Sequence, residues 1–344
     1  MKFTVSRHVK GPSFFAVLLL LWVFGVGAVA QSPSGKPTAR PENSRPPYWA
    51  YCPNPPAEDT HVPAKRGGAA PQRVPDSTAA FTLAQTSDLF EVPDWHPASH
   101  PPMPAIVGHG KKPDVYACGY CHLPNGQGRP ENSSLAGLPA DYIVRQMADF
   151  KSGVRKSAEP SHLPVAAMVG VATHTDKEEV QSAAAYFAAL KPKPWIRVVE
   201  TATVPETHVA GWMLVVSEPI RMEPIGQRIV ETPENLERTE LRDDTSGFIA
   251  YAPSGSMKKG KTLVVSGGAG KTLPCATCHG LNLKGSGDVP SLAGRSPSYI
   301  VRQLYDMQSG ARAGATTQAM MAPVANLTLD DMISIAAYTA SLHP

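Results

Sequence analysis

The chain has 344 residues and carries 32 lysines and arginines against 29 aspartates and glutamates, a net charge of +3. This balance argues against nucleic acid as a partner, because proteins that bind it normally present a clear excess of basic residues. The length allows two small globular domains, and an internal repeat marks two of them.

Residues 1–30 have the pattern of a secretory signal peptide. Lys2, Arg7 and Lys10 form a positive region, residues 14–26 an apolar stretch, and residues 28–30 a small-residue cleavage site. Cleavage predicts export to the periplasm and leaves 29 basic and 29 acidic residues, since residues 1–30 hold three basic and no acidic ones. An uncleaved inner-membrane anchor at residues 14–30 is the alternative, although this run is short for the roughly 20 residues of a spanning helix.

Residues 31–102 are rich in proline and lack apolar periodicity, which predicts an extended or wrapping arm. Its aromatic residues, Trp49 and Trp95 among them, are numerous for a solvated tether, so we expect parts of the arm to pack on the modules or on a partner. Cys52 is the one cysteine outside a paired motif and is expected to be an unpaired thiol. Pairing between chains, metal coordination and lipid attachment are the alternatives.

The pattern Cys-x-x-Cys-His occurs twice, at residues 118–122 and 275–279. This spacing is the signature of covalent c-type haem attachment, because two thiols on one helical turn each form a thioether to the haem and the next residue places an imidazole beneath the iron. The motifs therefore predict two haem c groups, with His122 and His279 as axial iron ligands and with thioethers to Cys118, Cys121, Cys275 and Cys278.

Zinc binding and thiol redox chemistry are the competing interpretations of these cysteines. The cysteine pairs of a zinc ribbon lie about 15–20 residues apart, whereas 153 residues separate Cys121 from Cys275. A redox dithiol does not need a histidine directly after the second cysteine.

The repeat extends beyond the cysteines. Residues 134–137 recur as 291–294 and residues 142–146 as 299–303, both with the offset of 157 that separates Cys275 from Cys118. We infer two copies of one haem module, at residues 103–190 and 258–344.

The offset falls to 152 near the end of each copy, because Tyr186 matches Tyr338, so the first copy has five extra residues after Arg155. Asp176 and Thr328 are each followed by acidic residues, the pattern of a helix N-cap and first turn. We expect a final helix in each copy, ending near residues 190 and 342.

In this register Met168 lies eight residues before Asp176, and Met320 eight before Thr328. We expect both in a loop before the last helix, from which a thioether reaches the second axial position of the iron. Methionine opposite histidine is usual in electron-transfer cytochromes, where sulfur favours ferrous iron. Met321 is a rival for Met320.

The first module offers other candidate ligands for the second axial position of its iron. His162 and His174 flank Met168 and are alternative ligands that would lower the potential. Met147 is assigned to the core.

Residues 191–257, between the modules, are too long for a plain linker. Short strands are predicted at residues 196–199, 211–216, 226–230 and 247–251, separated by turns. We expect a small β-containing connector that links the modules or covers a haem edge.

The repeated unit resembles the tandem two-haem class I cytochromes c, which are periplasmic electron carriers. The resemblance rests on the Cys-x-x-Cys-His motifs, the Leu-Ala-Gly turns at 135–137 and 292–294, the Tyr-x-x-x-Gln helices, the methionines and the aromatic residue of the last helix. It implies a mainly α-helical fold with each module wrapped around one haem.

The resemblance also implies roles for single residues. The carbonyl of Pro290 is expected to accept the imidazole proton of His279, and Ser133 stands at the matching place for His122, without the rigid proline turn. Arg145 and Arg302 are candidates for contact with haem propionates, with a surface helix charge as the alternative.

Tyr142 and Tyr299 are expected to be packing residues. The second module has eight basic and four acidic residues from Lys258 onward, so we considered a mildly positive docking face, with a merely solvated surface as the alternative.

We expect an electron carrier, because irons with two protein ligands leave no site for substrate. The partners would be redox proteins, among them a membrane dehydrogenase or oxidase, with association at the membrane surface as an option. The alternative is a catalytic di-haem oxidoreductase, peroxidase-like or thiosulfate-oxidising, with an open or displaceable axial position. On the first of these interpretations, the chain is an electron carrier or the electron-transfer subunit of an oxidoreductase and not itself an enzyme.

Substitution of the methionines tests the assignment of ligands. Met168→Ala and Met320→Ala should each remove half of the weak long-wavelength band of the ferric protein that reports iron–sulfur ligation, because each removes one thioether. Met321→Ala should leave the band intact. If Met321→Ala alone abolishes the signal of the second haem, the repeat register is wrong.

Overall fold

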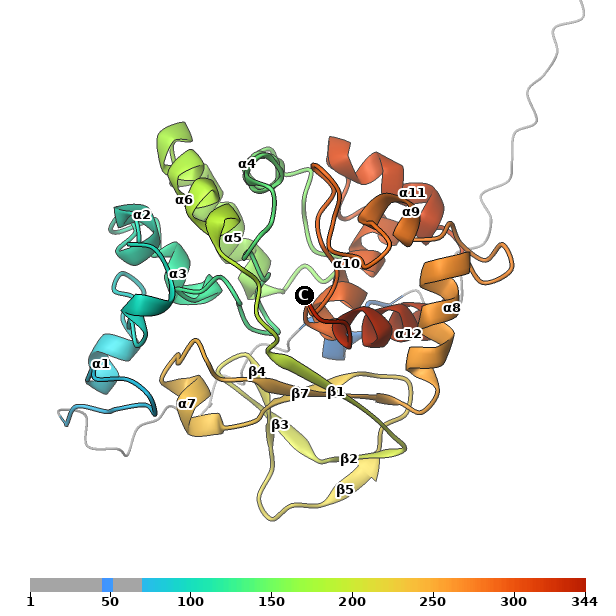
Figure 1. Ribbon diagram of the computed structural model, residues 1–344, viewed down its shortest axis with the longest axis horizontal. Coiled ribbons are helices and arrows are strands. Elements are labelled where there is room, and N and C mark those ends of the chain that lie inside the picture. Colours follow the sequence, from blue (N-terminus) through green and yellow to red (C-terminus); the bar gives the residue numbers. More distant parts are fainter. Residues whose placement is uncertain (1–44, 52–69) are drawn as a thin grey trace, which may run out of the picture. The chain divides into compact units, whose positions relative to one another are not determined.

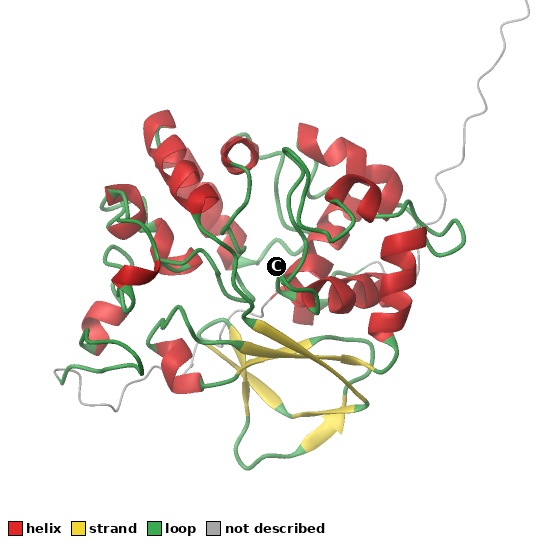
Figure 2. Ribbon diagram, viewed as in Figure 1, coloured by secondary structure: helices red, strands yellow, loops and turns green. Residues whose placement is uncertain are grey.

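The computed structural model describes residues 45–51 and 70–344. The predicted signal peptide and Cys52 lie outside these residues. The described chain is mainly helical; its small β region comes between two sets of helices along the sequence and lies below both of them in the view of Figures 1 and 2. None of the described helices is long and apolar enough to cross a membrane.

The first module contains five helices: α2 (Ala105–Gly108), α3 (Cys118–His122), α4 (Ala140–Lys151), α5 (Leu163–His174) and α6 (Lys177–Ala189). Helix α4 packs against α5 and α6. The α6 N-terminus is closed by a capping box, in which the Asp176 side chain accepts from the Glu179 amide at 2.8 Å and the Glu179 side chain accepts from the Asp176 amide at 2.9 Å. The predicted N-cap is confirmed.

The second module has the helices α8 (Ser256–Ser266), α9 (Ala276–His279), α10 (Pro297–Ser309), η3 (Ala315–Thr317), α11 (Gln318–Val324) and α12 (Leu329–Ala340). Thr328 and Asp331 form the capping box of α12, so this predicted N-cap is also confirmed. Helix α12 packs against α8 and α10, and its buried residues form much of the module core.

Helices α8 and α12 approach closely at Gly260. A methyl group at this position would overlap the carbonyl group of Ser334 and meet the Cβ of Tyr338 at 2.8 Å. The absence of a side chain therefore sets the separation of the two helices.

The connector consists of three small sheets and the short helix α7 (Leu236–Glu240). In the largest sheet, β7 (Phe248–Pro253) pairs in parallel with β1 (Ile196–Thr201) and antiparallel with β6 (Val230–Pro233). The side chain of Glu231, on β6, accepts from the Ser298 amide at 2.9 Å and from the Ser296 hydroxyl at 2.8 Å. The connector thus caps the N-terminus of α10 in the second module.

The predicted strands are confirmed at β1, β7 and β4 (Met213–Val216), with shifted ends. The strand expected at 226–230 starts only at Val230. The strand expected at 211–216 starts late because Gly211 and Trp212 form the turn of a hairpin, both with positive φ, between β3 (Thr207–Ala210) and β4. Strands β2 (Thr203–Pro205) and β5 (Met222–Pro224) were not predicted, since each is only three residues long.

The described parts of the arm pack on the rest of the chain, as predicted from their aromatic residues. The 3₁₀ helix η1 (Tyr48–Tyr51) contributes Trp49 and Tyr51 to the core of the second module. Residues 70–102 include α1 (Leu83–Thr86) and η2 (Pro97–Ser99). Trp95 is fully buried there, and its indole donates to the Leu241 carbonyl of the connector at 2.8 Å.

Gly260→Ala should lower the free energy of unfolding by about 1–3 kcal/mol, because the added methyl overpacks the contact between α8 and α12. Gly170→Ala, in the interior of α5 with open space around it, is the matched control and should be neutral or stabilising by up to about 1 kcal/mol. Denaturant titration measures both. Equal effects of the two substitutions would contradict this view of the helix contact.

Candidate haem sites

The first attachment motif forms α3 itself, so its two cysteines lie on one helical turn. The His122 side chain is buried, and its Nδ1 donates to the Ser133 carbonyl at 2.8 Å. This is the contact that the resemblance implies for Ser133. Burial lowers the pKa of His122, so the imidazole is neutral and its other nitrogen keeps the lone pair that binds a metal.

A cavity with an empty volume of about 820 Å³, partly open to solvent, lies beside this motif. Cys118, Cys121 and His122 line it from α3, and Met168 lines it from α5. Most other wall residues are apolar: Ile106, Ala117, Leu135, Ile143, Met147, Pro164, Ala167, Val171, Val180, Ala183 and Phe187. The apolar walls, together with two cysteines and a histidine on one side, suit a large, flat, covalently held cofactor.

Met168 lies on a helix, so the expected loop is wrong for the first module. Residues Pro164, Met168 and Val171 follow one another by four and three positions, which places them on one face of α5, and all three line the cavity. Met320 likewise lies on helix α11. Sequence patterns do not reveal these helices, because neither has a side-chain hydrogen bond at its N-cap and α5 is apolar on most of its surface.

The alternative iron ligands of the first module lie elsewhere than Met168. His162 and His174 are not among the residues that line the cavity. The ring of His174 is exposed and hydrogen-bonded to the Gly170 carbonyl at 2.9 Å, while buried His162 packs edge-on against Tyr51. Met147, assigned to the core from sequence, shares the cavity wall with Met168.

The second motif has the same proximal geometry. Cys275 caps α9, and the Nδ1 of buried His279 donates to the Pro290 carbonyl at 2.8 Å, as the resemblance implies. Met320 is partly buried against the core of this module, whereas Met321 is 36% exposed. Cys278 is exposed, unlike the other three motif cysteines.

The two candidate propionate ligands, Arg145 and Arg302, lie in different surroundings although they are repeat-related. Arg145 forms a half-exposed ion pair with Asp288 at 3.2 Å, an inter-module contact. Arg302 is fully buried and donates to the carbonyls of Ala50, Pro130 and Glu131. It therefore joins α10 to the arm and to the first module.

A second pair of arginines forms a symmetric network between the modules. Arg155 donates to Gln146 Oε1 at 2.8 Å and to Gln303 Oε1 at 3.1 Å. Arg312 donates to the same two oxygens, at 2.7 and 2.8 Å respectively. Arg312 follows Arg155 by the repeat offset of 157 and pairs with it in an isolated β-bridge, so the duplicated sequence produces a pseudo-twofold contact.

The tyrosines of the repeat complete this network. Tyr142 accepts from Arg312 at 2.8 Å, and Tyr299 accepts from Arg155 at 3.3 Å. Burial by itself raises the pKa of Tyr299, but the two guanidinium groups outweigh it and lower the pKa to about 8. Both tyrosines are therefore hydrogen-bonded members of the interface as well as packing residues.

The connector covers the first module near the cavity. Trp212, at the tip of the β3–β4 hairpin, lines the cavity wall. The Arg242 guanidinium lies 3.5 Å from the ring centroid of Tyr120, which stands between the two motif cysteines, and donates to the Tyr120 carbonyl at 2.8 Å. The connector thus covers the first module at the attachment motif.

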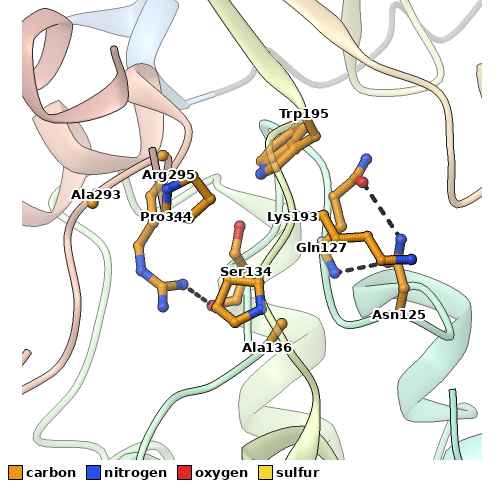
Figure 3. Close-up of a pocket in the computed structure, with 11 residues that line it drawn as sticks. Asn125, Gln127, Ser134, Ala136, Lys193, Trp195, Ala293, Arg295 and Pro344 are labelled. Atoms are coloured by element: carbon orange, nitrogen blue, oxygen red, sulfur yellow. Dashed lines mark hydrogen bonds between the residues drawn. The ribbon is translucent and has the colours of Figure 1, made fainter. Parts of the chain in front are cut away.

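A smaller pocket marks the junction of the two modules and the connector (Figure 3). Arg295 of the second module reaches the Ser134 carbonyl of the first, while Trp195 comes from the start of the connector. Ser134 and Ser291, both acceptors of Arg295, are repeat-related positions.

These residues fit haem c groups. Each module presents two cysteines on one turn, an oriented neutral histidine and a methionine, and the first has an apolar cavity between them. The buried guanidiniums of Arg155, Arg295, Arg302 and Arg312 donate to neutral oxygens in the hydrogen bonds described above. The buried carboxyl group of Asp306 interacts electrostatically with Arg155, Arg302 and Arg312, and none of the four guanidiniums lines the cavity of the first site.

Comparison with known proteins supports this assignment, although no family model matches the chain. The chain is 25% identical over 245 residues to cytochrome c4 of Azotobacter vinelandii, which covers 70% of this chain and 89% of that protein. It is 40% identical over 85 residues to cytochrome c-554(547) of Halothiobacillus neapolitanus, covering 22% and 93%. It is 26% identical over 207 residues to the thiosulfate dehydrogenase electron acceptor of Thiomonas intermedia strain K12, covering 59% and 67%.

A duplicated helical module with one attachment motif in each copy defines a di-haem c-type cytochrome. The chain belongs to the tandem di-haem cytochromes c, which are electron-transfer proteins, and it carries two covalently bound haem c groups.

Sequence reasoning missed Arg155 and Arg312 as contacts between the modules, and it missed the connector residues that cover the first module. A signal was present for the first group, because Arg155 and Arg312 share the repeat offset with Gln146 and Gln303. No comparable signal marks Trp212 or Arg242, since neither belongs to the repeat.

Arg312→Met should lower the free energy of unfolding by about 1–3 kcal/mol, because it leaves the buried oxygens of Gln146 and Tyr142 short of a donor. Arg145→Met removes only a half-exposed ion pair and should cost less than about 1 kcal/mol. Denaturant titration followed by haem absorbance measures both. A larger loss for Arg145→Met would contradict the central role of the buried network.

Proposed function

We propose that this cytochrome relays single electrons between redox proteins of the periplasm, with each iron ligated by one histidine and one methionine: His122 with Met168, and His279 with Met320. The main support for this proposal is that Met168 lies in the wall of the same cavity as Cys118, Cys121 and His122. When bound, each haem supplies a one-electron iron couple.

The chain's own residues prepare each site for this role. The Ser133 and Pro290 carbonyls orient the two histidines and fix the nitrogen that carries the proton. The apolar residues contributed by α4, α5 and α6 reduce the contact of the first site with water, which favours the less charged ferrous state. A relay needs no further group, since substrate does not bind to an iron with both axial positions filled.

The choice among methionines is supported by the repeat. Met168 and Met320 are equivalent positions, whereas Met147 corresponds to Leu304, which has no sulfur. Burial favours Met320 over Met321 in the second module.

Of the two candidates for contact with a haem propionate, we propose Arg302. Its hydrogen bonds go to the carbonyls of Ala50, Pro130 and Glu131, and its charge also acts on the buried carboxyl groups of Glu231 and Asp306. Arg145 is the weaker candidate, because its guanidinium already pairs with Asp288.

The partners are proposed to be redox proteins, a dehydrogenase on the donor side among them. The relative named as an electron acceptor of thiosulfate dehydrogenase supports this class of donor. A positive docking face on the second module is poorly supported. Arg295, Arg302 and Arg312 are buried, and Lys259 and Lys271 pair with Asp331. Periplasmic location is proposed from the predicted signal peptide.

Cyanide binding to the ferric protein tests the relay. The native protein should bind no cyanide and turn over no peroxide, because both irons are closed. Met168→Ala should bind one cyanide per chain, and Met147→Ala, from the same cavity wall, should behave as the native protein. A native haem that binds cyanide or peroxide without prior reduction would exclude the relay for that module and favour the catalytic alternative.

A further inference from the structure

A cluster of metal-ligating side chains lies away from the haem sites, where the arm meets the connector. It consists of His96 from the arm and of Asp243 and Asp244 from the loop between α7 and β7. One ligand atom from each residue lies within 4.8 Å of the other two. Trp95, the neighbour of His96, is anchored to Leu241 of the same loop, so the backbone on both sides is held in place.

Asp244 is the unusual member of this cluster. Its side chain is buried, with 1% of the residue exposed, and neither carboxylate oxygen has a hydrogen-bond partner. The nearest basic group is His96, whose Nε2 lies 3.9 Å from Oδ1 of Asp244, too far for a hydrogen bond. A buried carboxylate without donors is costly, so it points to a cation that would satisfy it.

Asp243 differs from Asp244 because its charge is already compensated. Its Oδ2 accepts from Arg238 at 2.7 Å, and its Oδ1 accepts from the Thr245 amide at 2.9 Å. The same Oδ1 lies 3.1 Å from His96 Nε2. Arg238 and Thr245 therefore orient Asp243 towards the histidine and leave the charge of Asp244 unmatched.

The surroundings add further negative charge. Asp94 lies close enough to raise the pKa of Asp244 together with burial and Asp243, and it pairs with His100 at 3.2 Å. The Asp94–His100 pair thus lies within electrostatic range of the cluster, in which Arg238 is the permanent cation and is paired with Asp243.

We propose that His96, Asp243 and Asp244 form a binding site for a divalent transition cation of the Zn²⁺ type, which ties the arm to the connector. Imidazole nitrogen together with carboxylate oxygen is a ligand set that Zn²⁺ accepts. Ligand atoms about 2.0–2.2 Å from a tetrahedral zinc lie roughly 3.3–3.6 Å apart, between the two distances of His96 to the aspartates. The three side chains leave the fourth position for water, and the site is independent of the proposed relay.

Zinc titration of the holoprotein tests this site. With both haems attached, the four motif cysteines are thioethers and do not compete for zinc. After removal of metal by a chelator, the protein should bind one Zn²⁺ per chain in a chelator-competition assay, and its melting temperature should rise on binding. Asp244→Asn should weaken binding by at least about 10–100-fold, the range seen even for loss of outer-sphere groups.

His109→Gln is the matched control, because His109 also pairs with a carboxylate, Glu91, at 3.0 Å but on the exposed surface. It should bind zinc as the native chain does. His96→Gln serves as a second site variant should Asp244→Asn fail to fold, with unchanged haem absorption as the check on folding. The proposal is overturned if the native holoprotein binds no zinc at micromolar concentration, or if the site variants bind it as tightly as the native chain.

Discussion

The two halves of this cytochrome are held together by buried guanidinium groups. The hydrogen bonds of these groups go to neutral oxygens and not to carboxylates. Arg155 and Arg312 share the amide oxygens of Gln146 and Gln303, so each module contributes one donor and one acceptor to the same network. Such a contact forms only when both modules are folded and docked, because each arginine would otherwise lack half of its hydrogen-bond acceptors. Duplication of the module produces this network directly, since one arginine and one glutamine in each copy provide its guanidinium donors and amide acceptors.

The remaining structure makes the two equivalent modules different. Trp212 and Arg242 of the connector cover the first module at its cavity and its attachment motif, whereas Cys278 of the second motif is exposed. The arm adds to this difference, because Tyr51 packs in the second module and donates to Asp306 at 2.8 Å, while Trp95 is buried against the connector. Two haems of one chemical type thus lie in unlike surroundings, which is how a protein separates the potentials of identical cofactors.

Much of the fold was predictable from local signals. The capping boxes at Asp176 and Thr328 were visible because a polar N-cap followed by an acid three residues later acts within one turn. The distal helices α5 and α11 were missed, since α5 is apolar on most of its surface and α11 is short and contains Pro323. The hairpin turn at Gly211 and Trp212 was missed as well, because a tryptophan with positive φ contradicts ordinary turn preferences.

The two haem attachment motifs and their histidines can be read directly from the amino-acid sequence, and the repeat register points to Met168 and Met320 as the proposed second ligands. These features are legible because covalent attachment demands fixed spacing along the chain. The surroundings of Arg302, Trp212 and Asp244 become visible only in the folded chain, since residues far away in sequence provide them. The physical reason is burial. When a charged group or an indole is buried, protein groups replace the water around it, and the local sequence does not indicate which groups these are.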